Sequence, residues 1–484
     1  MATKQPCRLL DHLLRESAER EWLEFKVNNC NPQEIGEYVS ALANAAMLCD
    51  RDKSYLVFGV ENGSRSKVGT EIVLSKARGK GAEGLANWLS RLVEPPVAIE
   101  YLDFECDGKN FAIMCIEPSY DRPVKFSGTA YVRVGEHKKK LADHIELERA
   151  LWLATNRRKF EDAVALSHQP LDEVLSLLDW KSYFALTGEE APVPDTEILR
   201  KLEKLGAVRS NMEGGFDILN LGAVLLANDV GNFPSIKGKA VRVIKYKGLV
   251  KGKSEPEQEG KRGYAVGFTN LIKYIMRRST EEVIVDGVRR NVPLCPEEAV
   301  REVVANALIH QDFTNGGTGP VVEIYANRIE ITNPGNSLIE TDRMIDERRS
   351  RNEKLAAAMR TLGLCEERGG GLDRTLIAIE NSHLPALQFI PSKDSMRVVL
   401  FGATSFKKMS KLDKQRACFF HCIIRWISHD YMSNSSLRAR FDLPQEEYQT
   451  VSSIIAAELK AGRIVPADPM QGKKNARYVP YWAR

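Results

Sequence analysis

The sequence predicts a multidomain protein of the α+β class, because of its length, its composition and its mixed periodicities. With 484 residues the chain is longer than one ordinary domain. Apolar residues make up 43% and charged residues 28%, so each domain has side chains for both a core and a hydrated surface. Strand-like alternation and helical spacing both recur along the chain. Changes in these patterns divide it into four regions: 1–155, 156–285, 286–405 and 406–484.

Composition also bears on compartment and partners. The nine cysteines are scattered without a Cys-x-x-Cys pair, which is typical of reduced thiols in a cytosol. No run of about 18 uncharged apolar residues occurs, and the N-terminal segment lacks the apolar block of a secretory signal. We therefore expect a cytoplasmic protein without a membrane partner. The formal net charge of +4 is too small to indicate nucleic acid, so local basic clusters matter more.

The first region combines a charged strand with a capped helix. In the strand-like run WLEFKV, Glu24 and Lys26 share a face because strand side chains alternate. Glu19 precedes them, and Asn31 caps a helix with Glu34 completing a capping box. Paired carboxylates can hold divalent metal, which polarises a phosphate. A neighbouring lysine can offset the charge that develops on that phosphate.

These residues resemble the Schlafen/AlbA-like domain over most of residues 12–155. The resemblance rests on E-x4-EFK at 19–26, VSALANAA at 39–46, YLVFGVEN at 55–62 and PVKFSGTAYVRVGEHKKKL at 123–141. Members of that family bind nucleic acid, and some cut RNA with a carboxylate cluster.

The resemblance implies roles for individual residues. Glu19 and Glu24 correspond to the two family acids, and Lys26 lies beside them. Glu61 is the candidate third acid, because Asn62 is an amide where the nuclease pattern expects a carboxylate. Two interpretations stay open: a domain that only binds nucleic acid, or a nuclease that uses Mg²⁺ or Mn²⁺.

The third region contains a helix with an unusual polar line. In PEEAVREVVANALIHQDF, Glu302, Asn306 and His310 follow one another at i, i+4 and i+8, on a different face from the apolar residues. Such a line needs partners, and magnesium with a triphosphate would supply them. Further along come a turn at 333–335 and a glycine run at 369–371 before another helix, where backbone N–H groups can approach phosphate.

The order of these motifs resembles the GHKL ATPase fold over about residues 295–400. The resemblance implies that Asn306 holds Mg²⁺ and that Glu302 orients or deprotonates the attacking water. Better-known members carry an Asp-x-Gly-x-Gly turn that reads the adenine amine, whereas this chain has Asn333-Pro334-Gly335. We expect ATP and Mg²⁺ as cofactors, and the further cofactor-binding candidates are His310, Asn333, Gly335, Gly369, Gly370 and Gly371.

The fourth region parses as helix, short helix, turn, helix and a β-like tail, which predicts a winged helix-turn-helix. In its last helix Tyr448, Val451, Ile455 and Leu459 form the expected buried stripe. Such modules contact either DNA or other proteins. Two basic clusters are candidates for phosphate contact, one in the first region and one in the tail: Lys138, Lys139 and Lys140, and Lys473, Lys474 and Arg477.

As a whole the chain resembles prokaryotic Schlafen/AlbA–GHKL–winged-helix proteins, and three hypotheses follow. The first is an ATP-controlled nucleic-acid effector, with ATPase and metal-dependent endonuclease activity in anti-phage defence. The second is a non-enzymatic, ATP-responsive DNA-binding transcriptional regulator. The third is a scaffold without turnover. GHKL modules often pair, so the resemblance also implies a homodimer or a higher oligomer. No chemistry is assigned to the connector at 156–285.

Overall fold

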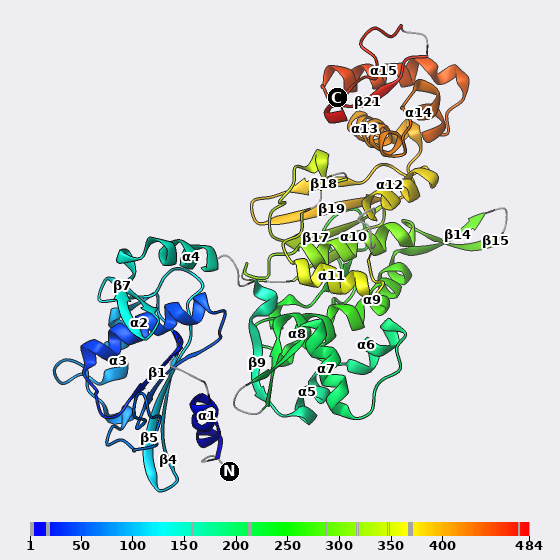
Figure 1. The fold of residues 1–484 in the computed structure, drawn as a ribbon. Coiled ribbons are helices and arrows are strands. Elements are labelled where there is room, and N and C mark those ends of the chain that lie inside the picture. Colours follow the sequence, from blue (N-terminus) through cyan, green and yellow to red (C-terminus); the bar gives the residue numbers. More distant parts are fainter. Residues whose placement is uncertain are drawn as a thin grey trace. The chain divides into compact units, whose positions relative to one another are not determined.

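The computed structural model divides the chain into two compact units (Figure 1). One holds residues 1–163, 167–170 and 209–217, and the other holds the remainder. The structure describes residues 4–15, 20–155, 159–211, 215–285, 288–315, 317, 319–345, 347, 349–365, 371–472 and 475–483. Within these ranges no helix is long and apolar enough to cross a membrane.

The first unit is built on a four-stranded sheet in the order β1-β2-β5-β4. Its strands are β1 (Leu23–Lys26), β2 (Ser54–Phe58), β4 (Ile99–Cys106) and β5 (Lys109–Ile116). β1 and β2 run parallel, so the chain must cross over between them, and helix α2 (Pro32–Leu48) makes that crossover. Apolar clusters form on both sides of the sheet, one including α2 and the other including α1 (Lys4–Leu14).

Local sequence explains where α2 begins. The side chain of Asn31 accepts hydrogen bonds from the backbone N–H groups of Gln33 and Glu34, and Pro32 occupies the first turn. The predicted capping box is not formed, because the Glu34 carboxylate accepts a 2.7 Å hydrogen bond from the Asn29 amide instead. The apolar face of α2, with Ile35, Val39, Leu42 and Ala46, is buried.

A second sheet of the first unit has the order β3-β6-β7-β8. It comprises β3 (Val93–Glu94), β6 (Lys125–Phe126), β7 (Thr129–Val134) and β8 (His137–Lys140), and the unit also contains α3 (Leu85–Leu92) and α4 (Ile145–Thr155). Buried Asn44 of α2 is hydrogen-bonded to both backbone groups of Val124 and to the carbonyl of Tyr131, at 2.7–2.9 Å. One amide thus fixes β7 against α2.

The second unit contains a six-stranded sheet in the order β13-β12-β16-β17-β19-β18. The strands are β12 (Arg242–Lys245), β13 (Gln258–Glu259), β16 (Val321–Ile324), β17 (Arg328–Pro334), β18 (Gln388–Pro391) and β19 (Ser395–Phe401). β12 and β16 are parallel, and the other pairs are antiparallel. The helices around it are α9 (Tyr264–Ser279), α10 (Glu297–His310), α11 (Glu353–Thr361) and α12 (Gly371–Asn381). α10 packs on α12, α9 and β17.

The sheet does not follow the boundary expected at 285/286. β12 and β13 belong to the same sheet as β16–β19, although sequence patterns group them with the connector. The reason is tertiary, since β12 pairs in parallel with β16 across more than 70 residues of intervening chain. The preceding segment holds β9 (Val164–Gln169), α5 (Leu171–Leu177), α6 (Trp180–Thr187), α7 (Asp195–Leu205), β10 (Val208–Asn211), β11 (Gly215–Leu219) and α8 (Asn220–Leu226).

The C-terminal residues form three helices and a two-stranded sheet. These are α13 (Lys411–Ile427), α14 (Asn434–Arg440), α15 (Tyr448–Lys460), β20 (Ile464–Pro466) and β21 (Tyr478–Pro480). The order agrees with the predicted parse, and Val451 and Ile455 are buried as expected. Tyr448 is instead 46% exposed, because it lies in the first turn of α15; Ile454 and Glu458 are buried on the inner face.

Candidate functional site

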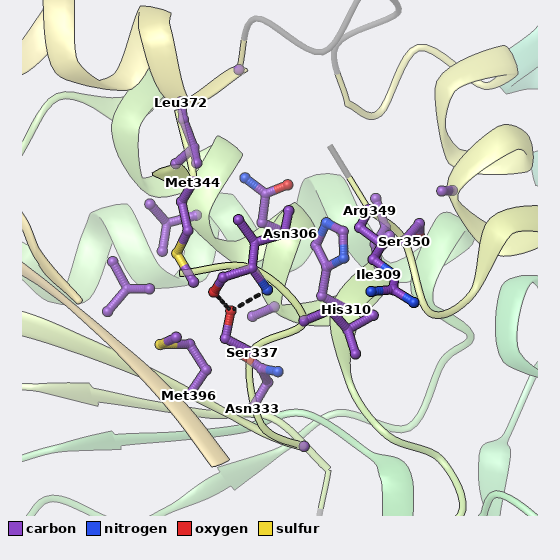
Figure 2. Close-up of a pocket in the computed structure, with 18 of the residues that line it drawn as sticks. Asn306, Ile309, His310, Asn333, Ser337, Met344, Arg349, Ser350, Leu372 and Met396 are labelled. Atoms are coloured by element: carbon purple, nitrogen blue, oxygen red, sulfur yellow. Dashed lines mark hydrogen bonds between the residues drawn. The ribbon is translucent and has the colours of Figure 1, made fainter. Parts of the chain in front are cut away.

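A cavity of about 320 Å³ opens in the second unit between α10, the end of β17 and the start of α12 (Figure 2). Its volume falls at the lower end of the range for small-molecule sites, which is about 300–1,000 Å³. The lining includes the residues that the sequence singles out for a nucleotide, as far as the structure describes them: Glu302, Asn306, His310, Asn333, Gly335 and Gly371.

Helix α10 brings the polar line of the sequence into this cavity. Four-residue spacing places Glu302, Asn306 and His310 one above another, and all three contribute to the lining. The amide nitrogen of Asn306 donates a long, 3.4 Å hydrogen bond to Oε1 of Glu302. The contact uses the amide nitrogen and not the amide oxygen of Asn306, and the oxygen is the atom with which an asparagine ligates Mg²⁺.

His310 is electrically neutral at pH 7. Burial lowers its pKa below the ordinary value, and the positive charge of Arg351 lowers that pKa further. A neutral imidazole offers one donor and one acceptor. His310 therefore suits a hydrogen bond with a sugar or base better than an ion pair with a phosphate.

The turn after β17 forms a second wall, and its glycine is required by both conformation and space. Gly335 has a φ of +98°, and a β-carbon there would lie 2.8 Å from the β-carbon of Asp312. Its N–H donates to the carbonyl of Asp394 at 2.8 Å. Beside it Asn333 is 95% buried and donates to the carbonyl of Pro334 at 3.2 Å. The turn is thus held close to the end of α10.

Two adjacent residues fasten the C-terminal end of α10. Asn352 is buried and donates to the carbonyls of Ile309 at 2.7 Å and Gln311 at 2.8 Å. Arg351 contacts Asp312 at 3.2 Å and the backbone carbonyl of the residue after Gly335 at 3.1 Å. From the sequence, both residues are secondary candidates for the nucleotide site. Their only local signal is an Arg-Asn pair directly before a helix.

Asp312 stays charged in this arrangement. Burial by itself would raise its pKa, but hydrogen bonds from Thr314 and the charge of Arg351 outweigh burial and lower it. Because the carboxylate is ionised, it can hold Arg351 against the turn that contains Gly335.

The start of α12 closes the cavity at the Glu302 end. A β-carbon on Gly371 would lie 1.7 Å from Oε1 of Glu302, so only glycine leaves room for this carboxylate. Gly369 and Gly370, also predicted for the phosphates, lie outside the described residues. The lining also includes apolar side chains from three separate segments: Leu338, Met344, Leu372, Phe389, Met396 and Val398.

The charged strand of the first unit forms a separate cluster. Glu24 is 98% buried; Lys26 binds its Oε1 at 2.7 Å, and the buried guanidinium of Arg133 binds its Oε2. The ring of Tyr38 lies 4.8 Å from the Lys26 ammonium and 4.5 Å from that of Lys138. This cationic cluster, consisting of Glu24, Lys26, Tyr38, Arg133 and Lys138, therefore holds two cations against one buried acid and a third cation, Lys138, beside the same aromatic ring.

The acids predicted as metal ligands do not gather here. Within the described ranges no group of three Asp, Glu, His or Cys side chains could hold a metal ion. Both carboxylate oxygens of Glu24 are already bound by cations. Glu61 is exposed and accepts hydrogen bonds from Ser64 and Ser66, which lower its pKa. Glu19 lies outside the described residues, so the predicted metal role of Glu24 with Glu61 has no support in the structure.

The members of the predicted basic clusters differ in their surroundings. Lys138 lies opposite Arg133 in the β7–β8 ladder and binds Glu37 at 2.5 Å, whereas Lys139 and Lys140 are exposed. Arg477 is exposed, and its guanidinium lies 5.5 Å from the ring centre of Tyr431. Lys473 and Lys474 lie outside the described residues.

The fold defines a multidomain protein, and the cavity lies in the part of it that is ATPase-like. The family model "Schlafen, AlbA_2" matches residues 19–142, and the model "Putative ATP-dependent DNA helicase recG C-terminal" matches residues 317–400. The chain carries a Schlafen/AlbA_2 domain followed by a RecG-type C-terminal ATPase domain. α10 precedes the second match, yet it lines the same cavity as matched residues 333–335 and 371.

Two solved structures are similar to this chain. One is the DIP2311 protein from Corynebacterium diphtheriae, at 15% identity and a TM-score of 0.42, covering 98% of this chain and 97% of that one. The other is the N-terminal domain of a "Putative ATP-dependent DNA Helicase RecG-related Protein" from Nitrosomonas europaea, at 20% identity and a TM-score of 0.18, covering 28% and 90%. Comparison with curated proteins finds no match.

Replacing Asn306 by Ala removes Mg²⁺-dependent ATP binding, because it deletes the amide oxygen assigned to the metal. Wild-type protein at an ATP concentration 100 times Kd gains about 2.7 kcal/mol of stability, and Asn306→Ala loses this gain. The variant Glu302→Gln is expected to keep this stabilisation by ATP and to lose ATP hydrolysis. Thermal unfolding with and without Mg-ATP measures the first effect, and phosphate release the second. Exposed Asn232→Ala is the control; an unchanged ATP response in Asn306→Ala contradicts the assignment.

Replacing Gly371 by Ala displaces the carboxylate of Glu302, because the new methyl group occupies its place. Alanine also favours helix, so we expect no loss of folding stability. We expect ATP hydrolysis to fall on the order of 100-fold, as for a misplaced catalytic group. Gly248→Ala, where a β-carbon meets no atom within 4 Å, is the matched control. Equal rates in the two variants would show that Glu302 does not act from this position.

Replacing Arg133 by Gln destabilises the first unit, because Glu24 then loses the buried one of its two cationic partners. Breaking a buried pair costs about 3–5 kcal/mol, and Glu24→Gln in the same chain restores part of this loss. Urea unfolding followed by tryptophan fluorescence, to which Trp22 and Trp88 of the first unit contribute, reports the change. Glu100→Gln, which breaks the exposed pair with Lys53, is expected to cost at most about 1 kcal/mol.

Proposed function

We propose that the protein is an ATP-binding, ATP-controlled protein that acts on nucleic acid. The observation that carries this proposal is the convergence of α10, the 333–335 turn and the start of α12 on one cavity. These elements come from different parts of the sequence, and each contributes a side chain or glycine with a role in handling a nucleotide. The two matched domain families, one of them described by a DNA helicase, support the nucleic-acid part.

The donor set of the cavity fits Mg-ATP. Asn306 offers an amide oxygen for Mg²⁺, and the space that Gly371 leaves beside Glu302 suits the triphosphate end. Neutral His310 and buried Asn333 offer hydrogen bonds, and the apolar wall with Met344, among others, suits a base. Bound Mg²⁺ supplies neutralisation of phosphate charge and polarises the terminal phosphoryl group.

Glu302 is the group that would act on water. Its carboxylate lies against Gly371 at the start of α12 and accepts a 3.4 Å hydrogen bond from the amide of Asn306. A carboxylate in this place can orient a water molecule and accept its proton as the bond to phosphorus forms. This supports ATP turnover, with Glu302 as the base and Asn306 as the metal ligand.

The cationic cluster of the first unit supports phosphate binding. Lys26 and Lys138 lie within cation–π distance of Tyr38, and Arg133 extends the positive charge below them. An aromatic ring among cations can stack on a base while the cations contact phosphates. Exposed Arg477 offers a second contact if the C-terminal helices act as the winged helix that their order predicts.

A second form of the function is a DNA-binding regulator without nuclease activity. It is favoured by one observation: both oxygens of Glu24 are bound by Lys26 and Arg133, which competes with metal binding. The nuclease effector requires that these ion pairs open. The two forms differ in whether the first domain cuts what it binds.

One experiment on the full chain separates these forms. Labelled tRNA, single-stranded DNA and duplex DNA are incubated with the protein and Mg²⁺ or Mn²⁺, with and without ATP, and both retention and cleavage are measured. We expect ATP to change retention, and Lys26→Ala to weaken it; Lys80→Ala, at an exposed position of the same unit, is the control. Cleavage that is lost in Glu24→Gln would establish the nuclease. An absence of any ATP effect on all substrates would contradict the proposal.

A further inference from the structure

A second cavity, of about 280 Å³, lies in the second unit between α9 and the strands β12 and β13. It shares no lining residue with the nucleotide cavity, although α10 contributes to both, with Leu308 here and Ala307 there. Its volume is close to the lower limit of small-molecule sites, which is about 300 Å³. The cavity therefore has room for one small molecule or for one unit of a larger one.

The walls of this cavity carry apolar and aromatic side chains. Val241 and Val243 line it from the side of the sheet, and Leu271 and Tyr274 line it from α9. Gly267, Leu271 and Tyr274 follow one another at intervals of four and three residues, so they lie on one face of the helix. Apolar walls with an aromatic ring suit a ligand that contains a planar ring.

The loop 260–263 also lines the cavity, and the surrounding backbone holds it in place. Three backbone hydrogen bonds of 2.8 Å fix this loop, from Gly260 to Val241, from Gly263 to Ala227 and from Val230 to Lys261. The guanidinium of Arg262 lies 3.2 Å from the carboxylate of Asp179. A loop that is already fixed loses little conformational entropy when a ligand binds, which favours affinity.

The charges of the lining favour an anion, because its two charged residues, Lys261 and Arg262, are both basic. Lys261 is exposed and forms no ion pair within the described part of the chain. Arg262 has five N–H donors and keeps some of them free of its contact with Asp179. The acid of β13, Glu259, lies on the other face of the sheet, since the strand partner of its lining neighbour Gln258 is Val243.

Two amide side chains complete the lining. Gln258 and Asn270 are both exposed, and the amide nitrogen of Gln258 donates to the carbonyl of Glu259 at 3.1 Å, which leaves its oxygen as an acceptor. Amides of this kind can pair with the edge of a nucleobase, because they place a donor beside an acceptor. Cations, an apolar wall with an aromatic ring, and amides thus match the phosphate, the face and the edge of one nucleotide.

We propose that this cavity binds a nucleoside monophosphate unit, with its phosphate on Lys261 and Arg262 and its base between α9 and β12. A free mononucleotide and the end of a nucleic-acid strand present the same groups, so both are sources of this unit. The site is separate from the cavity at Asn306, and the inference does not rest on ATP binding there.

Equilibrium dialysis of the full-length protein against each common nucleoside monophosphate, without Mg²⁺, tests the site. Gly267→Leu fills the cavity, because a β-carbon at 267 lies 3.4 Å from that of Arg262, and leucine favours helix. This variant is expected to bind one nucleotide fewer per chain than the wild type. Lys261→Ala is expected to weaken binding about tenfold, as for the loss of one charge-assisted hydrogen bond. Lys273→Ala, at an exposed position of α9 outside the lining, is the control.

Further ligands identify the source and can overturn the proposal. A 5′-phosphorylated tetranucleotide that binds more tightly than the mononucleotide assigns the site to the end of a strand, and one that binds more weakly assigns it to a free nucleotide. Equal nucleotide binding by wild type and Gly267→Leu overturns the proposal, as does a nucleoside that binds as tightly as its monophosphate. Stabilisation by Mg-ATP is measured on the same samples. Its absence would contradict the proposed function and leave the result at this second cavity unchanged.

Discussion

The close approach of α12 to α10 is the constraint on which the nucleotide site depends. Gly371 starts α12 directly against the carboxylate of Glu302, where any side chain would collide. α10 cannot shift away, because Asn352 holds the last carbonyls of its C-terminal end. The cavity lies between these two helices, and Asn306 lines it. The amide nitrogen of Asn306 is already hydrogen-bonded to Glu302.

Helix α12 joins the cavity to the C-terminal helices. At its far end Glu380 binds His421 of α13 at 3.0 Å and lies 3.5 Å from the guanidinium of Arg440 in α14. Phe389 makes a second connection, because it lines the cavity and packs edge-on against Phe420 at a centroid distance of 6.2 Å. α12 is therefore shared between the nucleotide cavity and the part of the chain predicted to contact DNA.

The first unit is organised around buried polar contacts in a similar way. Asn44 ties α2 to the segment before β6 and to β7, and this contact sets the position of Arg133 on β7. From there Arg133 reaches Glu24 on β1 in the other sheet. The ion pair gives the second oxygen of this buried acid a cationic partner, beside the one that Lys26 already supplies to the first.

Local spacing is enough to predict the domain families, the N-cap of α2 at Asn31 and the polar line of α10. The line of Glu302, Asn306 and His310 needs only the 3.6-residue period of a helix, and the turn at Gly335 needs only a residue that tolerates positive φ. Tertiary structure decided what spacing cannot encode. The pairing of β12 with β16 joins segments far apart in the chain, and the capture of Glu24 by Arg133 depends on two sheets meeting across α2. Local sequence fixes the direction in which a side chain points, but only the packed fold determines which partner it meets.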